Sequence, residues 1–252
     1  MWQNFSRKFV ERKAWLGIVL PIWVLASFAL AQVIVSIIMG LLDTFGVPWT
    51  AANENIISAV YSAVVYGLTL ALVIGLPWAI KKYKTTKEDI GVTDYPRWLD
   101  LLLAPAGFIV YVILAGIMLM IATQLFPALN VQEAQDTGFS ELVRGFEYLV
   151  AFLTLVVVAP VAEEILFRGY LLGKLRKHVP LWIAILLTSL LFAGLHWPVS
   201  VMIDVFVLSI VLCLLRVFSK SLWPSIFLHM IKNAIAFYVL FINPTLFTTL
   251  GG

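Results

Sequence analysis

Seven long apolar stretches constrain the fold of this chain more than any other feature of its sequence. A helix needs about 20 predominantly apolar residues to cross the ~30 Å hydrocarbon core of a bilayer, and each stretch reaches or approaches that length. Only 12% of the residues are charged, against about 25% in a typical soluble domain. We therefore predict an all-α, polytopic transmembrane bundle of about seven helices, within a range of six to eight. The stretches are Trp15–Leu42, Ile56–Ile80, Leu99–Phe126, Phe146–Leu172, Leu181–Trp197, Val201–Phe218 and Leu222–Ile242.

The apolar stretches predict a single transmembrane domain over residues 1–252, in two parts. Residues 1–145 hold almost no ionisable side chain inside their apolar stretches, so we expect scaffold helices there. Residues 146–242 carry the polar motifs, and we expect the functional core there. Within this core, only His196–Ser200 separates the two shortest stretches, which are either two tilted spans or a partly re-entrant hairpin.

The distribution of positive charge predicts how the helices are oriented. Of the 17 Lys and Arg residues, 15 lie in the N-terminal tail or at and beyond the C-terminal ends of the second, fourth and sixth stretches, leaving only Arg144 and Lys232. Because cytoplasmic loops carry an excess of Lys and Arg, we expect a cytoplasmic N-terminus, seven crossings and a C-terminus outside the cell. The same distribution accounts for the net charge of +3, so membrane lipids rather than nucleic acid are the expected partners. The compact chain, without long soluble insertions, favours a bacterial cytoplasmic membrane.

The fourth stretch contains two adjacent glutamates, and ionisable groups at membrane depth mark functional sites by default. Glu164 and Arg168 are four residues apart on a helix, so they lie on one face and can pair. Glu163 points about 100° away from that face, because a helix makes one turn every 3.6 residues. Pro160, one turn earlier, removes a backbone donor and favours a kink. We interpret Glu164 and Arg168 as a structural ion pair, and Glu163 as an unpaired carboxylate that faces a cavity and suits general-base chemistry.

Three further polar residues in apolar surroundings complete a plausible hydrolytic set. His229 and Asn233 are four residues apart on the seventh stretch, and His196 lies at the end of the fifth. Peptide hydrolysis needs an activated water and hydrogen-bond donors for the developing oxyanion. Glu163 with His196 could supply the first, and His229 with Asn233 the second. The same Glu163, His196 and His229 could equally bind zinc, since two histidines and a carboxylate are a common catalytic ligand set.

The sequence leaves alternatives open for two polar residues of this region. Counting 1.5 Å per residue from the basic ends of the stretches puts His196 about two turns deeper than the other site residues. The fifth helix must therefore be tilted, or begin outside the membrane. Asp204, in the sixth stretch, is interpreted either as a residue that orients a histidine or as the partner in a structural hydrogen bond.

Three motifs, in this order, resemble those of the CAAX protease and bacteriocin-processing family, which is also called the Abi family of intramembrane proteases. The resemblance covers roughly residues 146–242, and Ser221–Ser225 is similar to the family's usual lead-in to the third motif. Three ordered motifs on apolar helices are far more specific than one glutamate pair. The motifs are Glu163-Glu164-x-x-x-Arg168, Phe192-x-x-x-His196 and His229-x-x-x-Asn233.

The resemblance implies a helical membrane endopeptidase that cleaves a membrane-associated or lipid-modified peptide or protein. It implies that Glu163 activates water with the help of His196 and that His229 and Asn233 stabilise the oxyanion, while the need for zinc stays open. Two other functions compete with this one. An immunity or regulatory protein of the same family would bind without cleaving, and a proton-coupled transporter would relay protons through intramembrane carboxylates. The chain shows no internal repeat of the kind that many transporters have.

Overall fold

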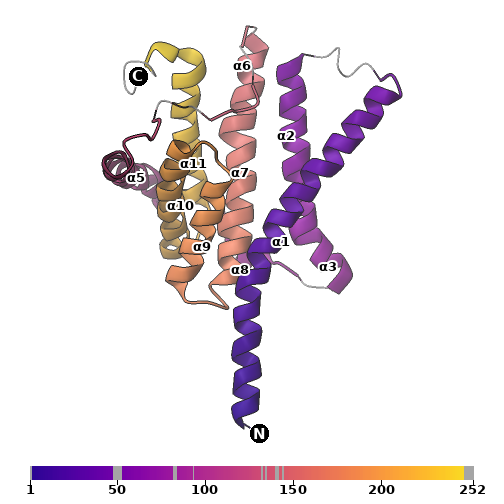
Figure 1. Ribbon diagram of the computed structural model, residues 1–252, viewed down its shortest axis with the longest axis vertical. Coiled ribbons are helices and arrows are strands. Elements are labelled where there is room, and N and C mark those ends of the chain that lie inside the picture. The colour runs from indigo at the N-terminus through magenta and orange to yellow at the C-terminus, as the bar shows by residue number, and fades with distance from the viewer. Residues whose placement is uncertain are drawn as a thin grey trace.

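The structure is a computed structural model that describes residues 2–47, 53–81, 84–92, 94–131, 133, 135–139, 142–143 and 145–246. Side chains are described from Trp15 onward, except that of Lys81, and Arg144 of the orientation argument lies outside the described residues. Over the described residues the regular structure is all helical, without strands (Figure 1). The predicted all-α class is therefore confirmed.

The N-terminal part consists of long helices and one short docking helix. Its elements are α1 (Trp2–Thr44), α2 (Glu54–Leu70), the π-helical η2 (Ala71–Gly75), α3 (Leu76–Lys81), α4 (Lys87–Ile90) and α5 (Trp98–Leu125).

The C-terminal part begins with a helical column that changes between α and π geometry along its length. The column consists of α6 (Gly145–Phe152), η3 (Leu153–Val158), α7 (Ala159–Glu164), η4 (Ile165–Leu171) and α8 (Leu172–Leu175). The remaining elements are α9 (Leu181–Gly194), α10 (Val199–Ser219), α11 (Trp223–Phe237) and the π-helical η5 (Tyr238–Ile242).

Six helical stretches of the described chain are long and apolar enough to cross a membrane, which agrees with the predicted bundle of six to eight. The fifth predicted stretch differs, because α9 has only 14 residues. A helix of that length extends about 21 Å, short of the ~30 Å hydrocarbon core. Of the seven expected crossings, the fifth is thus a shorter apolar helix. The six long stretches are Trp15–Thr44, Glu54–Ile80, Trp98–Leu125, Gly145–Leu175, Val199–Ser219 and Trp223–Ile242.

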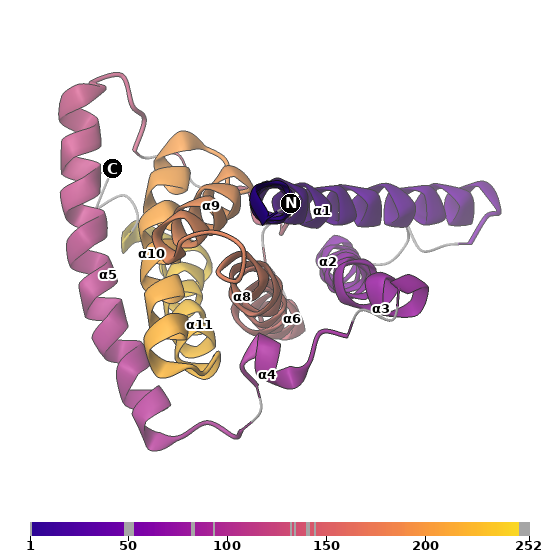
Figure 2. The same ribbon diagram turned by 90° about the horizontal axis from the view of Figure 1, so that it is seen from below.

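The column α6–α8 stands at the centre of the bundle. Figure 1 shows α1 and α2 on one side of it and α9, α10 and α11 on the other. Seen from below, α5 runs along the outer side of α10 and α11, at a steep angle to the column (Figure 2). The central position lets the column contact helices from both halves of the chain, and this decides which side chains can reach its glutamates.

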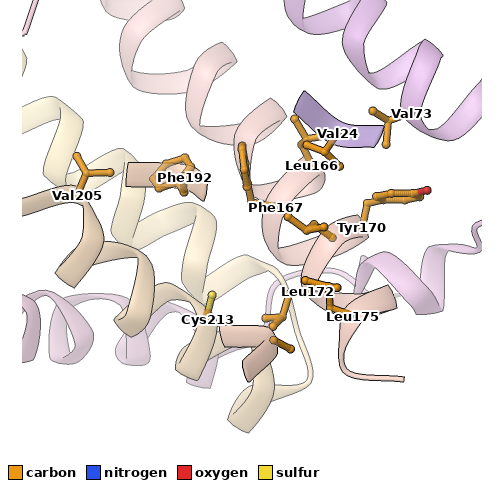
Figure 3. Close-up of a cluster of buried hydrophobic side chains, with 12 residues drawn as sticks. Val24, Val73, Leu166, Phe167, Tyr170, Leu172, Leu175, Phe192, Val205 and Cys213 are labelled. Atoms are coloured by element: carbon orange, nitrogen blue, oxygen red, sulfur yellow. The ribbon is translucent and has the colours of Figure 1, made fainter. Parts of the chain in front are cut away.

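A buried apolar cluster joins the column to α1, η2, α9 and α10 (Figure 3). Phe167 and Phe192 belong to this cluster, with ring centroids 4.9 Å apart. Cys213, the only cysteine of the chain, is fully buried in this cluster as a free thiol. The cluster fixes the height of α9 against η4, and therefore the height of the loop that carries His196.

The short helix α4 docks against the lower end of the column. The Asp89 carboxylate pairs with Lys177 at 2.6 Å and with Lys174 at 3.3 Å. The hydrogen bond from Lys177 is the main reason that the pKa of Asp89 falls to about 2. Gly91 follows in the left-handed region, at φ +89°, and a Cβ there would lie 2.5 Å from the Arg216 guanidinium. This close approach explains a glycine at position 91.

Candidate active site

A cavity of about 760 Å³ opens between the column, α2, α5, α10 and α11. Glu163, His196, His229 and Asn233 all line it. The structure thus brings together the four residues that the sequence predicts to act on the substrate, from three separate parts of the chain. The C-terminal turn of α9 lies against the column, where Phe192 packs on Phe167, and this contact brings His196 close to the glutamates.

Glu164 and Arg168 form the buried pair that their spacing predicts. Both side chains are completely buried, and Arg168 Nη1 donates to Glu164 Oε1 at 2.8 Å. Arg168 Nη2 donates to Ser209 Oγ on α10, and its guanidinium lies over the Phe192 ring, 4.2 Å from the centroid. The intervening turn is π-helical rather than α-helical, yet the four-residue spacing still brings the two side chains together. The pair balances one of the two glutamate charges inside the bundle.

His229 lies between the two glutamates of the column. Its Nδ1 is 2.9 Å from Glu164 Oε1, and its Nε2 is 3.7 Å from Glu163 Oε2. Glu164 is ionised by its pairing with Arg168 and can only accept, so His229 Nδ1 carries the proton of this bond. The second distance is an ion-pair distance, longer than a hydrogen bond. Glu164 therefore orients the ring, and Nε2 is left to face Glu163.

His196 is held by the backbone of its own helix. Its Nδ1 lies 2.7 Å from the carbonyl oxygen of Phe192, four residues earlier. A backbone carbonyl has no proton to give, so Nδ1 is the donor and Nε2 is the unprotonated nitrogen of the neutral ring. The Phe192 ring packs on both imidazoles, with centroids 4.6 Å from His196 and 5.8 Å from His229. Phe192 thereby spaces the two histidines along the cavity wall.

Glu163 has a partner that sequence reasoning missed. The prediction of an unpaired carboxylate is wrong, because the Tyr66 hydroxyl on α2 donates a short hydrogen bond to Glu163 Oε1. The side chain of Glu163 is 12% exposed and still lines the cavity. Tyr66 belongs to the part of the chain that was expected to be scaffold only. A tyrosine inside a long apolar helix is the single sequence signal that could have pointed to it.

Asn233 bonds to a backbone carbonyl that Pro160 leaves without a donor. Its Nδ2 donates to the carbonyl oxygen of Leu155 at 2.8 Å. At this point the column has π geometry, since the amide of Ala159 donates five residues back to Thr154. The next amide would belong to Pro160, which has no N–H, so Leu155 lacks its backbone donor. Asn233 therefore replaces a hydrogen bond that the proline removes, and its second amide hydrogen is left over.

Asp204 belongs to a second polar group on the same cavity wall. It accepts from the Tyr111 hydroxyl at 2.6 Å, and its other oxygen is 3.8 Å from Lys232 Nζ. Of the two interpretations of Asp204, these contacts support the structural hydrogen bond, which joins α10 to α5. Lys232, one of the two Lys and Arg residues outside the expected basic face, thus lines the cavity beside Asn233.

The predicted zinc set can be tested on the arrangement of its side chains. Among the residues that the structure describes, no group of three or more His, Cys, Asp or Glu side chains could hold a metal ion. Glu163, His196 and His229 share a cavity but do not converge as a three-ligand site. The residues present do not fit the ion, so the mechanism below includes no metal step.

Comparison with known proteins shows what the motif-bearing segment is similar to. Residues 145–235 match the family model of type II CAAX prenyl endopeptidase Rce1-like proteins. An uncharacterized 24.3 kDa protein of Escherichia coli is 30% identical over 89 residues, which are 33% of this chain and 41% of that protein. The UPF0177 protein YxdF of Lactococcus lactis is 26% identical over 134 residues, 51% of this chain and 67% of that protein. No solved structure matches the chain significantly.

The matched residues 145–235 contain all three motifs and every motif residue that lines the cavity. The match confirms the resemblance that the motifs predict. The six long apolar helices of the described chain support an integral membrane protein. The segment 145–235 is similar to the Rce1-like type II CAAX prenyl endopeptidase family.

Proposed function

We propose that the protein is an intramembrane endopeptidase that hydrolyses a peptide bond of a membrane-associated or lipid-modified substrate. One observation carries the proposal: a carboxylate and two imidazoles from separate parts of the chain line one cavity within the apolar bundle. Buried charged groups are expensive in a bilayer, and a set like this one is maintained for chemistry more readily than for stability. The family match supports the same reaction class.

The first step assigned to the site is activation of a water molecule. Glu163 Oε2 and His196 Nε2 are both acceptors on the cavity wall, so a water can donate one hydrogen to each and turn a lone pair toward the scissile carbonyl. As the new C–O bond forms, one proton passes from water to Glu163. When the C–N bond breaks, Glu163 gives that proton to the leaving amine, so the carboxylate is regenerated.

The second step is stabilisation of the oxyanion that forms on the scissile carbonyl. The free amide hydrogen of Asn233 and the Nε2–H of a protonated His229 are the donors for it. Glu164 bonds to His229 Nδ1 and holds the ring in place, so that Nε2 faces Glu163. This division of roles follows the resemblance, and it gives the buried Glu164–Arg168 pair an indirect part in the chemistry.

Cleavage of a prenylated CAAX-type reporter peptide by the purified protein tests the proposal. We expect Glu163→Gln to lower kcat/KM by about 10²–10⁴-fold, the usual contribution of a general base. Glu54→Gln, which neutralises an exposed glutamate at the start of α2, is the matched control and should cleave like the wild type. Equal cleavage by wild type and Glu163→Gln would refute the assignment of the base.

Addition of a chelator to the same assay tests the role of zinc separately. Since the site residues do not converge on a three-ligand site, we expect activity to persist after metal removal. Loss of cleavage that returns on adding zinc would show that the site rearranges around a metal. Proton flux in liposomes, abolished by Glu163→Gln, would instead favour the transporter, and binding without cleavage would favour an immunity or regulatory protein.

The membrane setting forms part of the proposal. The positive charge at the N-terminal tail and around α3, α4 and α8 supports a cytoplasmic location of that end of the bundle. In the structure the lower end of α1 and the end of η5 lie at opposite ends of the molecule (Figure 1), which agrees with a cytoplasmic N-terminus and a C-terminus outside. Membrane lipids and the peptide substrate are the partners we assign.

A further inference from the structure

Tyr66 reaches the proposed catalytic glutamate from outside the family-matched segment. It lies on α2, 97 residues before Glu163, and its hydroxyl donates to Glu163 Oε1. The matched segment begins only at residue 145. Within the described part of the chain, no other residue outside that segment is seen to donate a hydrogen bond to Glu163 or Glu164. The scaffold half therefore contributes a polar group to the site itself.

We propose that Tyr66 is a positioning residue for Glu163, an inference that rests on the proposed function. A glutamate side chain that lines a cavity can turn about its last bond and exchange its two oxygens. The bond from Tyr66 holds Oε1, so Oε2 remains on the side of His229, 3.7 Å from Nε2. Oε2 is then the oxygen that receives the proton from water. Tyr66 touches neither water nor substrate in this scheme and acts through Glu163 alone.

The helix that carries Tyr66 is itself fastened to the column. At its outer end, Asn53 caps α2 and donates from Nδ2 to Glu147 Oε1 at 2.7 Å. The other oxygen of Glu147 accepts from the amide of Val143 at 2.7 Å. Further along, Trp23 of α1 donates to the carbonyl of Val73 just beyond α2. Tyr66 therefore sits on a helix held at both ends, which a precise placement of Glu163 requires.

A purely structural tyrosine would predict a different outcome, so kinetics can separate the two roles. Positioning predicts that Tyr66→Phe lowers kcat by about tenfold to a hundredfold with little change in KM, because small misplacements of a reacting group cost rates of that order. The matched control is Tyr61→Phe, on the same helix, which removes a hydroxyl that is 3.3 Å from Ser36 Oγ. Tyr61→Phe should cleave the prenylated reporter like the wild type.

An infrared measurement tests the contact without a substrate. In protein with isotope-labelled tyrosine rings, the difference spectrum between wild type and Tyr66→Phe isolates the phenol band of Tyr66 among the 8 tyrosines. If Tyr66 donates to Glu163, Glu163→Gln should shift this band, because a neutral amide accepts more weakly than a carboxylate. Glu54→Gln should leave the band unchanged.

The two measurements have separate meanings. If the phenol band of Tyr66 does not shift in Glu163→Gln, the proposed contact is wrong. If Tyr66→Phe has the kcat of the wild type, the positioning role is wrong. If the band shifts while Glu163→Gln cleaves like the wild type, the contact stands and the proposed function fails. If both readouts change as expected, the active site of this protein includes a residue of the N-terminal half.

Discussion

Two neighbouring residues of the column have opposite surroundings. Glu164 is completely buried and bonds to Arg168 and His229, whereas Glu163 reaches the cavity. Successive helical residues point about 100° apart, so two neighbouring residues can place one charge in the protein interior and the other in a reaction space. Breaking a buried pair by removing one partner is costly, because the other charge is left uncompensated.

Arg168→Ala should therefore destabilise the protein strongly. We expect a loss of about 3–5 kcal/mol in the free energy of unfolding, the range typical of a buried pair that loses one partner. Arg176→Ala, which removes an exposed arginine after α8, should change it by less than about 0.5 kcal/mol. Thermal unfolding in detergent measures both. Similar midpoints for the two variants would contradict the burial of the pair.

At the scale of the element, the π-helical part of the column explains Asn233. Leu155 would receive its backbone hydrogen bond from residue 160 in this geometry, and Pro160 cannot donate. The kink expected at Pro160 stays a prediction; what the structure shows before this residue is a π-helical stretch. Its physical consequence is a carbonyl that recruits a side chain from α11, which links the packing of two helices to the cavity.

The double variant Pro160→Ala/Asn233→Ala tests this link. Asn233→Ala alone should cost about 1–3 kcal/mol of stability, the usual cost of a buried unsatisfied polar group. Pro160→Ala restores an N–H at position 160, so the double variant should recover part of that loss in thermal unfolding. Cleavage should not recover, since the side chain of Asn233 is still missing. If Asn233→Ala and Pro160→Ala/Asn233→Ala are equally stable, Asn233 does not replace the hydrogen bond that Pro160 removes.

The short helix α4 provides a prediction on pH. The folded pKa of Asp89 is about 2, below the ordinary value of 3.8, with the hydrogen bond from Lys177 as the main cause. Its ionised form therefore stabilises the docked α4 at pH values above 3.8, and this contribution is lost as the pH falls through 2. Hydrogen exchange of residues 87–92 should stay slow in the wild type at pH 3.

Variants of α4 and its flanking loop complete that test. Asp89→Asn should exchange faster than the wild type at pH 6, because Lys174 and Lys177 lose their charged partner. Asp94→Asn, which changes an exposed carboxylate after the same helix, is the control and should exchange like the wild type. If Asp89→Asn exchanges hydrogen at the same rate as the wild type at pH 6, α4 docks through other contacts.

At the scale of the whole molecule, the apolar stretches predicted the bundle well because length and hydropathy alone decide what can cross a bilayer. The spacing of Glu164 and Arg168 predicted their pairing, since both lie on one helix. Tyr66 was missed because it lies 97 residues before Glu163, and its approach to Glu163 depends on how the two helices that carry these residues pack together. The length of α9 was overestimated because apolar residues continue past its end at Gly194.

Orientation in the membrane can be tested with single cysteines. Cys213 is buried, and Cys213→Ala provides a background without other thiols. In intact cells, an impermeant maleimide should label Pro244→Cys, at the outer end, and should not label Arg176→Cys, on the basic face. Opening the cells should expose Arg176→Cys. The reverse pattern would overturn the predicted topology.

The hydrogen bond between Asn233 and Leu155 also sets an order of events during synthesis. Asn233 is made 78 residues after Leu155, and His229 follows Glu164 by 65 residues. An unpaired carbonyl in lipid costs several kcal/mol. The nascent column therefore stays incompletely satisfied until the last helix arrives, so a chain truncated before α11 is a substrate for quality control rather than a smaller folded protein.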